Sequence, residues 1–158
     1  MGRRGRGTFP EPALSTLTRI QMVVHLQSVD LFRYCSAEQM VRLASIAHQR
    51  RFRAGEPIYQ AGDAPESLYC LIEGAVLLRR EGEAGRTVAP QETFGVREIL
   101  SDQPRRDDAV ADADALALTL DAEDFFDLLS NNIEIVRSLF RQLLRPSPTA
   151  DAAAHALR

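Results

Sequence analysis

The chain has 158 residues, of which 45% are hydrophobic and 26% are charged. These values are typical of one soluble globular domain with its own hydrophobic core. The formal net charge of -3 at pH 7 argues against a general nucleic-acid binder.

The two ends of the chain are expected to lie outside the folded domain. The basic start, MGRRGRG, has no apolar segment after it and is therefore not a secretory signal. We expect a disordered basic tail over 1–13, a folded domain over 14–144, and a flexible tail over 145–158. No apolar run approaches the roughly 18 residues that span a bilayer, and we expect a cytoplasmic protein without a membrane span.

Two helices are predicted in the first third of the chain. The first lies within STLTRIQMVVHLQSV, with Ser15 as a candidate N-cap. Three apolar residues share one of its faces: Leu17, Ile20 and Val24. The second lies within CSAEQMVRLASIAHQ and begins with a capping box formed by Ser36 and Gln39. Its core-facing residues are expected to be Met40, Leu43 and Ala47.

Short strands are predicted from Arg51 to Leu120. The segments in this part are rich in β-branched and aromatic residues and are interrupted by Gly, Pro and Asp. About eight short strands at near-regular spacing indicate a sandwich or a barrel. Hairpin turns are expected at three places: Gly82 with Gly85, Gly62 with Asp63, and Glu73 with Gly74.

Helical patterns return at Asp121. The segment DAEDFFDLLS carries acidic residues in its first turn, which favours a helix N-terminus. Its inward-facing residues are expected to be Phe125, Leu128 and Leu129. Asn131 or Asn132 is predicted to cap a last helix with one apolar stripe: Ile133, Val136, Phe140 and Leu143. The predicted fold class is mainly β with flanking helices at both ends.

The run FRAGEPIYQAGDAPESLYCLIEGAV, residues 52–76, resembles the cyclic nucleotide-binding domain family of catabolite activators and protein kinase regulatory subunits. The matching positions are Phe52, Gly55, Ile58, Gly62, Asp63, Tyr69, Ile72, Gly74 and Val76. The resemblance covers about residues 26–144 and implies an eight-stranded antiparallel jelly roll. Its glycines are expected at sharp turns with positive φ. Four side chains are expected to point into the roll: Phe52, Ile58, Tyr69 and Ile72.

The resemblance also implies a phosphate-binding cassette. In the family, a Phe-Gly-Glu glutamate accepts a hydrogen bond from the ribose 2′-hydroxyl, and a later Pro-Arg arginine holds the cyclic phosphate with help from backbone N–H groups. The candidate cassette residues are Phe94, Gly95, Val96, Arg97, Glu98, Ile99, Leu100, Arg105 and Arg106. Val96 stands at the position of the glutamate. Arg106, Asp107 and Asp108 stand where the family has small hydroxyl and apolar residues.

The altered cassette allows three interpretations. Loss of the ribose acceptor at Val96 predicts an affinity about 10- to 150-fold lower, and Glu98 is expected to point elsewhere. Strand alternation puts Asp107 on the face of Arg105, so we favour an internal Arg–Asp ladder that needs no ligand. The alternatives are ordinary binding of cAMP or cGMP and binding of a different anionic small molecule.

No catalytic residue and no metal site are predicted. His25 and His48 lack carboxylates at a recognisable spacing, and no nucleophile motif is present. Cys35 and Cys70 fit no zinc or disulfide pattern, so we expect reduced, partly buried thiols. We therefore expect neither enzyme activity nor a resident cofactor.

The expected function is that of a non-catalytic regulatory domain with weak or lost cAMP and cGMP binding, acting as an interaction module. The alternative is a sensor whose ligand moves the C-terminal helices to signal to a partner. A protein partner or a second copy is expected to use Val136, Phe140 and Leu143, unless this stripe closes onto the roll. About 14 residues follow Leu144, too few for a DNA-reading module, so no direct DNA binding is expected.

Overall fold

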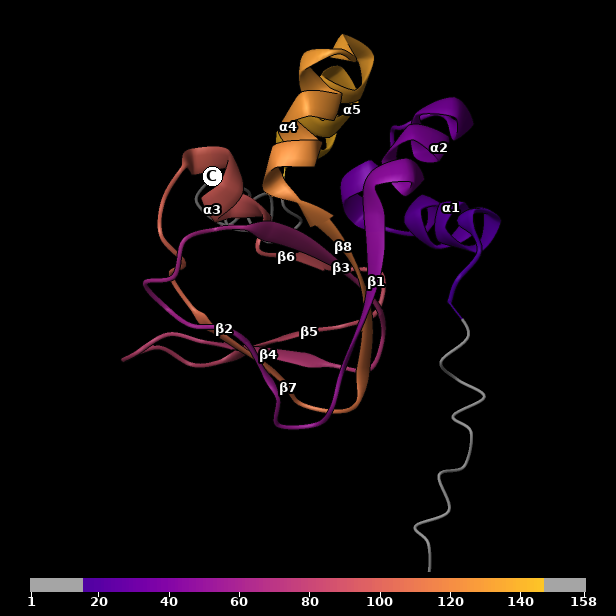
Figure 1. The fold of residues 1–158 in the computed structure, drawn as a ribbon. Coiled ribbons are helices and arrows are strands. Elements are labelled where there is room, and N and C mark those ends of the chain that lie inside the picture. The colour runs from indigo at the N-terminus through magenta and orange to yellow at the C-terminus, as the bar shows by residue number, and fades with distance from the viewer. Residues whose placement is uncertain (1–15, 147–158) are drawn as a thin grey trace, which may run out of the picture.

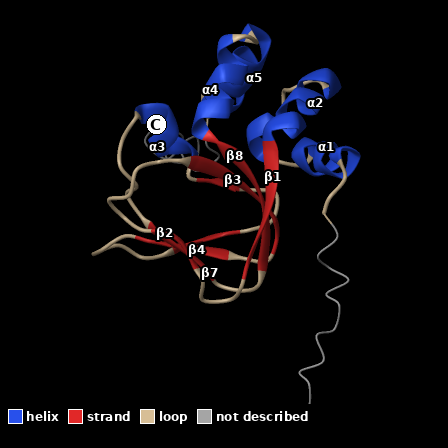
Figure 2. Cartoon of the chain, in the orientation of Figure 1, coloured by secondary structure: helices blue, strands red, loops and turns tan. Residues whose placement is uncertain are grey.

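Two four-stranded antiparallel sheets form a β-roll, and the helices gather at one side of it (Figures 1 and 2). The computed structural model describes residues 16–146. The first sheet has the order β1 (Ala47–Phe52), β8 (Ala115–Asp121), β3 (Ser67–Glu73) and β6 (Thr93–Phe94). The second has the order β2 (Pro57–Tyr59), β7 (Asp108–Ala111), β4 (Val76–Arg79) and β5 (Arg86–Val88). The predicted fold class and the eight strands are confirmed.

The two central strands of the first sheet, β8 and β3, are buried on both faces because they separate two hydrophobic clusters. Successive side chains of a strand point to opposite faces. In β8, Leu118 and Leu120 therefore pack with the helices, whereas Ala115 and Ala117 pack inside the roll. The sequence of this strand is almost continuously apolar because neither of its faces is exposed to solvent.

The predicted glycine turns are present, but only one of them is a hairpin. Gly55, Gly62 and Gly74 have φ values of 86, 93 and 90°, as the resemblance implied. The turn at Gly82 with Gly85 joins β4 to β5, which are neighbours in one sheet. The hairpins predicted at Gly62 and at Gly74 are wrong, because these turns connect strands of different sheets. Turn chemistry indicates where the chain bends, but not which sheet it enters next.

Two of the four side chains expected inside the roll are buried there. Phe52 and Tyr69 belong to the cluster inside the roll, and Ile58 is only half-buried against it. The prediction for Ile72 is wrong, because this residue packs against the helical cluster. Tyr69 and Ile72 lie three positions apart in a strand, so alternation sends them to opposite faces. Tyr59, next to Ile58, is the buried aromatic residue of β2.

The helices before the roll are α1 (Arg19–Gln27), the 3₁₀ helix η2 (Asp30–Phe32) and α2 (Ala37–Ile46). Thr18 caps α1 in a capping box with Gln21, and the predicted cap Ser15 lies outside the described residues. The face predicted for Leu17, Ile20 and Val24 is not the buried face of α1, since Ile20 and Val24 are exposed and Leu26 is buried instead. Leu17 is half-buried and precedes the helix. Apolar spacing alone did not show where this short helix begins.

The second predicted helix is confirmed in detail. Ser36 Oγ accepts from the backbone N–H of Gln39, whose side chain accepts from the N–H of Ser36. Met40 and Leu43 are buried in the helical cluster. Ala47 is buried there too, but it is already the first residue of β1.

Three further helices follow the start of the roll: α3 (Val96–Ser101), α4 (Ala122–Ser130) and α5 (Ile133–Leu143). Phe125 of α4 is fully buried, and Leu128 and Leu129 are half-buried, in agreement with the prediction. Asn132 is the N-cap residue of α5, although its side chain makes no capping bond.

The apolar stripe predicted for α5 does not close onto the roll. The residues of α5 that are buried are Ile135, Ser138 and Leu139. Ile133, Phe140 and Leu143 are exposed, and Val136 is half-buried. This helix has two apolar faces, and the one formed by Ile135 and Leu139 packs against η2 and α4.

Both cysteines are free, as predicted. Burial raises the pKa of Cys35 to about 11, with a smaller opposing effect from a hydrogen bond with Ser138. Burial raises the pKa of Cys70 to about 12. Both thiols therefore stay protonated at neutral pH. Within residues 16–146, no helix combines the length and the apolar character that crossing a membrane requires.

Candidate functional site

The candidate cassette forms one wall of a polar cavity of about 410 Å³. The chain leaves β6, turns at Gly95, forms α3, and returns through a loop to β7. The opposite wall comes from β4 and from the turn between β4 and β5. The chain therefore forms a cavity large enough for a small ligand at the position where the resemblance implied a binding site.

The structure brings most, but not all, of the candidate residues to this cavity. Those that line it are Phe94, Gly95, Val96, Arg97, Glu98 and Arg106. Ile99 is buried in the helical cluster, and Leu100 is largely exposed beside α4 and α5. Arg105, the expected phosphate ligand, is not among the lining residues. Sequence reasoning missed Arg80 and Arg86, which reach the cavity from the β4–β5 hairpin.

Arg105 is almost fully buried, with 4% of its surface exposed, and its donors are used inside the protein. Nη1 donates to the carbonyl oxygen of Gly95 at 2.6 Å, and Nη2 donates to the carbonyl oxygen of Ser67. The guanidinium also lies over the ring of Tyr59, 4.2 Å from its centroid. The arginine is thus held on three sides before any ligand arrives.

Gly95 is required at the turn that receives this arginine. Its φ is 76°, and a Cβ at this position would lie 2.8 Å from Arg105 Nη1. A larger residue would therefore strain the backbone and displace the guanidinium.

Glu98 occupies the fourth side of Arg105. Only 5% of its surface is exposed, and Oε2 lies 3.9 Å from Arg105 Nη1, a charge contact longer than a hydrogen bond. Oε1 accepts from the backbone N–H of Arg106 at 3.3 Å. The prediction that Glu98 points elsewhere is wrong, because the loop after α3 folds back onto it. Its carboxylate lines the cavity, whereas Arg105 does not.

The predicted Arg–Asp ladder is also wrong. Asp107 accepts from Arg80 Nε at 3.1 Å, and Asp108 accepts from the backbone N–H of Ala61 at 2.8 Å. Arg80 lies 3.4 Å from Glu83 as well. Alternation correctly separates the two aspartates, but each finds a partner on a different strand or loop, which sequence spacing does not reveal.

Aromatic rings pack against the same arginine from inside the roll. Tyr69 stacks on Phe94 with ring centroids 4.8 Å apart, and Tyr59 is tilted against both. Burial raises the pKa of Tyr59 above its ordinary value, and the smaller effect of Arg105 opposes this. Burial also raises the pKa of Tyr69. Both phenols are therefore neutral at physiological pH and serve as aromatic surfaces.

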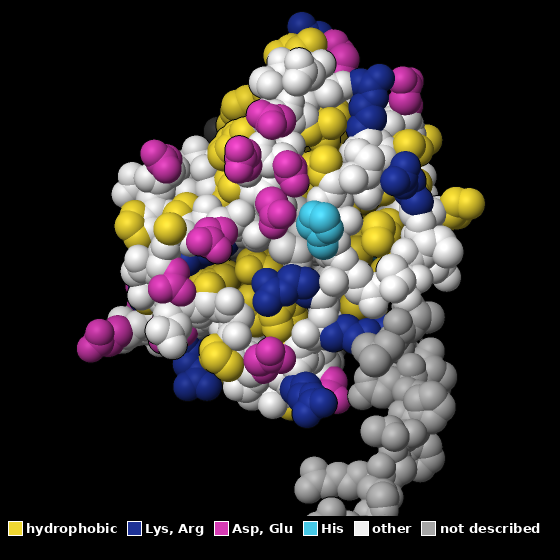
Figure 3. Space-filling view, in the orientation of Figure 1, with side chains coloured by type: hydrophobic (Ala, Val, Ile, Leu, Met, Phe, Trp, Pro, Cys, Tyr) yellow, Lys and Arg dark blue, Asp and Glu magenta, His cyan; other side chains and the backbone are white. Residues whose placement is uncertain are grey.

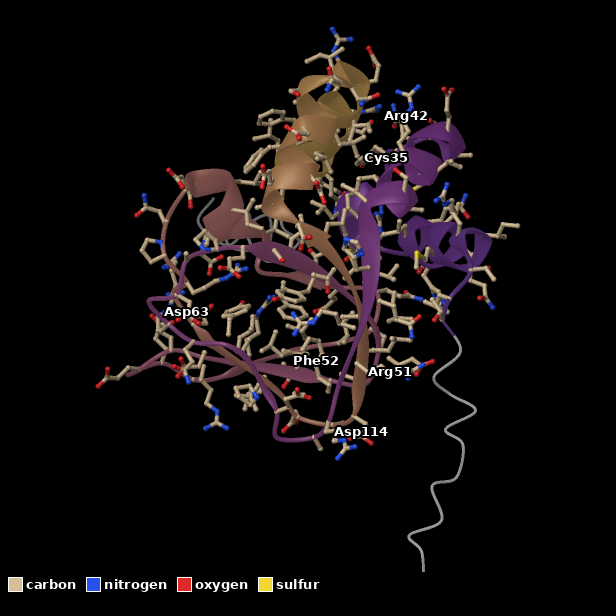
Figure 4. The ribbon with its side chains drawn as sticks, viewed as in Figure 1. Cys35, Arg42, Arg51, Phe52, Asp63 and Asp114 are labelled. Carbon is tan, nitrogen blue, oxygen red and sulfur yellow. The ribbon has the colours of Figure 1, made fainter. Side chains whose placement is uncertain are left out.

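A second polar cavity, of about 290 Å³, is lined by Arg105 itself. Its wall includes Arg50, Asp63, Glu66 and the two tyrosines. Asp63 lies in the loop after β2 (Figure 4). Its carbonyl oxygen accepts from the backbone N–H of Arg105 at 2.8 Å, which holds this loop against the cassette. Arg105 therefore belongs to the wall of the second cavity and not to that of the first.

His48 has carboxylate neighbours that sequence spacing did not predict. Its Nε2 lies 3.7 Å from Asp121 Oδ2, because β1 and β8 pair. Asp124 joins them, with ligand atoms of the three residues within 4.8 Å of one another. Figure 3 shows a histidine beside acidic side chains near the boundary of helices and roll.

An apolar hollow of about 210 Å³ lies between α3, α4 and α5. Its wall includes Val96, Leu100, Phe125, Val136, Phe140 and Leu143. Val96 therefore faces both this hollow and the polar cavity. The three residues predicted for partner binding come together here.

Comparisons with known proteins agree with this architecture. The family model of the cyclic nucleotide-binding domain matches residues 49–132. The cyclic AMP receptor protein of Thermus thermophilus is 32% identical over 126 residues, which cover 77% of this chain and 58% of that protein. The cAMP-dependent protein kinase type II regulatory subunit of Drosophila melanogaster is 24% identical over 134 residues, which cover 85% of this chain and 36% of that protein.

Among solved structures, the regulatory subunit of a cAMP-independent protein kinase A from Trypanosoma brucei has the same fold. Its TM-score is 0.66 at 19% identity, and the match covers 89% of this chain and 52% of that one. The chain thus spans less than two thirds of each of these three proteins. The family model matches more than half of the chain, and the Thermus thermophilus relative is 32% identical over 77% of it. The chain therefore belongs to the cyclic nucleotide-binding domain family.

Proposed function

We propose that this chain is a non-catalytic regulatory module that binds cAMP and cGMP weakly or not at all. The observation that carries the proposal is the internal binding of Arg105 by Glu98, Gly95 and Ser67. A cyclic phosphate would bind through this guanidinium, but its donors already make hydrogen bonds within the protein.

The energetic argument has two parts. Hydrogen bonds to charged groups are each worth roughly 1.5–3 kcal/mol, so a ligand that withdraws Arg105 from its carbonyl partners must replace several of them. The side chain of Val96 offers no acceptor to a ribose hydroxyl, so the sugar makes no hydrogen bond here that offsets this loss. Glu98 and Asp107 also line the cavity, and their side chains offer a cyclic phosphate no hydrogen-bond donor in place of Arg105.

The family relationship supports a regulatory role without requiring a cyclic nucleotide. One relative is named a cyclic AMP receptor protein, whereas a solved kinase subunit of the same fold is described as cAMP-independent. The fold alone therefore does not entail a response to cAMP.

Isothermal titration calorimetry of the wild-type chain with cAMP and with cGMP tests the proposal. We expect a Kd weaker than about 1 μM for both nucleotides, equivalent to less than about 8 kcal/mol of binding free energy. The Thermus thermophilus cyclic AMP receptor protein serves as the positive control in the same buffer. Submicromolar binding of either nucleotide by the wild-type chain contradicts the proposal.

We further propose that a protein partner, or a second copy of the chain, docks on the exposed face of α5 formed by Val136, Phe140 and Leu143. Phe140 is 56% exposed and Leu143 is 49% exposed, beside the apolar hollow. Figure 3 shows further hydrophobic side chains over the helical end of the molecule. Contiguous apolar surface of this kind marks interaction sites.

Sedimentation velocity over a range of concentrations separates the two occupants. If a second copy docks, the wild-type chain dimerises with rising concentration and Phe140→Asp remains monomeric. Val41→Asp is the matched control, because Val41 of α2 is an apolar residue of similar exposure, 49% against 56% for Phe140. A wild-type chain that stays monomeric throughout excludes the second copy as the occupant of this face.

A further inference from the structure

We infer that the cassette cavity binds a compact organic phosphate carrying at least two negative charges, in place of a singly charged cyclic phosphate. The inference rests on the proposed function, because it requires that Arg105 is not available to a cyclic nucleotide. The cavity is otherwise strongly cationic.

The carboxylates of the cavity are already bound by arginines. Three carboxylates line it: Glu83, Glu98 and Asp107. Arg80 contacts Glu83 at 3.4 Å and Asp107 at 3.1 Å. Glu98 is bound by Arg105 from behind the wall. Arg80 thus neutralises one of its two carboxylate partners and Arg105 neutralises Glu98, which leaves one negative charge of the wall uncompensated.

Three other arginines of the wall have no such partner. Within the described part of the chain, the side chains of Arg86, Arg97 and Arg106 make no ion pair and no hydrogen bond, and all three are exposed. They reach the cavity from β5, from α3 and from the loop before β7. Guanidinium groups that converge from separate elements are suited to bind phosphate oxygens.

The balance of charge selects the class of ligand. With Arg105 included, five arginines meet three carboxylates at this site, which leaves two positive charges in excess. A cyclic phosphodiester carries one negative charge. A terminal phosphate carries nearly two at neutral pH, because its second pKa is about 6. The cavity therefore matches a phosphomonoester or diphosphate better than a cyclic phosphate.

The rest of the wall indicates the remainder of the ligand. A volume of about 410 Å³ fits a nucleotide-sized molecule. Tyr59, Leu78, Phe94 and Val96 give the cavity an apolar side on which a flat ring can pack. Because Val96 accepts no hydrogen bond, the cavity does not select for a ribose hydroxyl.

The pair 5′-AMP and cAMP isolates the charge of the phosphate, since base and sugar are the same in both. In calorimetry at low salt, we expect 5′-AMP to bind at least about tenfold more tightly than cAMP, and this binding to weaken as salt rises. Arg97→Ala and Arg106→Ala are each expected to weaken 5′-AMP binding about tenfold. Arg51→Ala is the matched control, because Arg51 is an exposed arginine of β1 that points away from the roll (Figure 4).

The outcomes are distinct for this inference and for the proposed function. Tight binding of cAMP overturns the proposed function. Equally weak binding of cAMP and 5′-AMP leaves the proposed function in place and overturns the inference. If Arg51→Ala weakens 5′-AMP binding as much as Arg97→Ala does, the binding is non-specific surface attraction, and the inference is overturned.

Discussion

Replacing Glu98 with Ala and Val96 with Glu in the same chain is expected to raise the affinity for cAMP by on the order of 10²- to 10⁴-fold over wild type. The first change removes the carboxylate that faces the guanidinium of Arg105. The second restores an acceptor for the ribose hydroxyl at the wall of the cavity. The restored ribose contact is worth roughly 1.5–3 kcal/mol. Releasing Arg105 from the charge of Glu98, 3.9 Å away, is expected to contribute a similar amount.

The two single variants show how the effect is divided. Val96→Glu alone is expected to gain less than the double variant, because Glu98 still holds Arg105. Glu98→Ala alone leaves Arg105 with its carbonyl partners and the ring of Tyr59, so the arginine is not left as an isolated buried charge.

Calorimetry with cAMP measures the gain, and thermal unfolding of each variant confirms that it is folded. Adding Arg105→Ala to the double variant tests whether the gain in affinity for cAMP depends on Arg105. With Glu98 already absent, this third change leaves no buried carboxylate without a partner, yet it removes the phosphate ligand and should abolish the gain. A double variant whose affinity for cAMP equals that of the wild type shows that Glu98 is not what blocks the site.

The architecture was predictable because its signals are local. Glycines with positive φ must occur where the chain turns sharply, and Gly55, Gly62 and Gly74 do so. The capping box at Ser36 depends on residues three positions apart. Such features can be interpreted without knowing the rest of the fold.

The charge pairing of the site was not predictable for the opposite reason. Asp107 pairs with Arg80 because β7 and β4 are neighbours in the second sheet, and these two residues lie just beyond the paired Asp108 and Arg79. His48 contacts Asp121 only because β1 pairs with β8. Glu98 reaches Arg105 because a loop of the cassette reverses direction. Alternation within one strand gives the face of a side chain, but its partner depends on topology.

Gly74→Ala is expected to lower the free energy of unfolding by about 2–5 kcal/mol, a large part of the roughly 5–15 kcal/mol of a typical domain. A Cβ on Gly74 would lie 2.2 Å from the carbonyl oxygen of Asp114 and 2.8 Å from Cα of Ala115. Both atoms belong to the backbone, so no side chain can rotate away. The φ of 90° adds a conformational penalty.

The neighbouring turns prevent the backbone from yielding. The side chain of Asp114 accepts from the N–H of Ala54 at 2.9 Å, and the N–H of Asp112 donates to the carbonyl of Ala75 at 2.9 Å. The turn before β8 is thus tied to the turns after β1 and β3, at the end of the roll where Asp114 lies (Figure 4). Moving it to admit a methyl group would break contacts of three turns at once.

Gly55→Ala separates the two contributions, because Gly55 has nearly the same φ, 86°, but no atom within 4 Å of an added Cβ. This variant is expected to lose only the conformational penalty, about 1–2 kcal/mol. Urea unfolding of both variants and of the wild type gives the comparison. Equal losses for Gly74→Ala and Gly55→Ala would mean that the turn before β8 moves freely, and that the close approach of Gly74 to Asp114 does not fix how the sheets join.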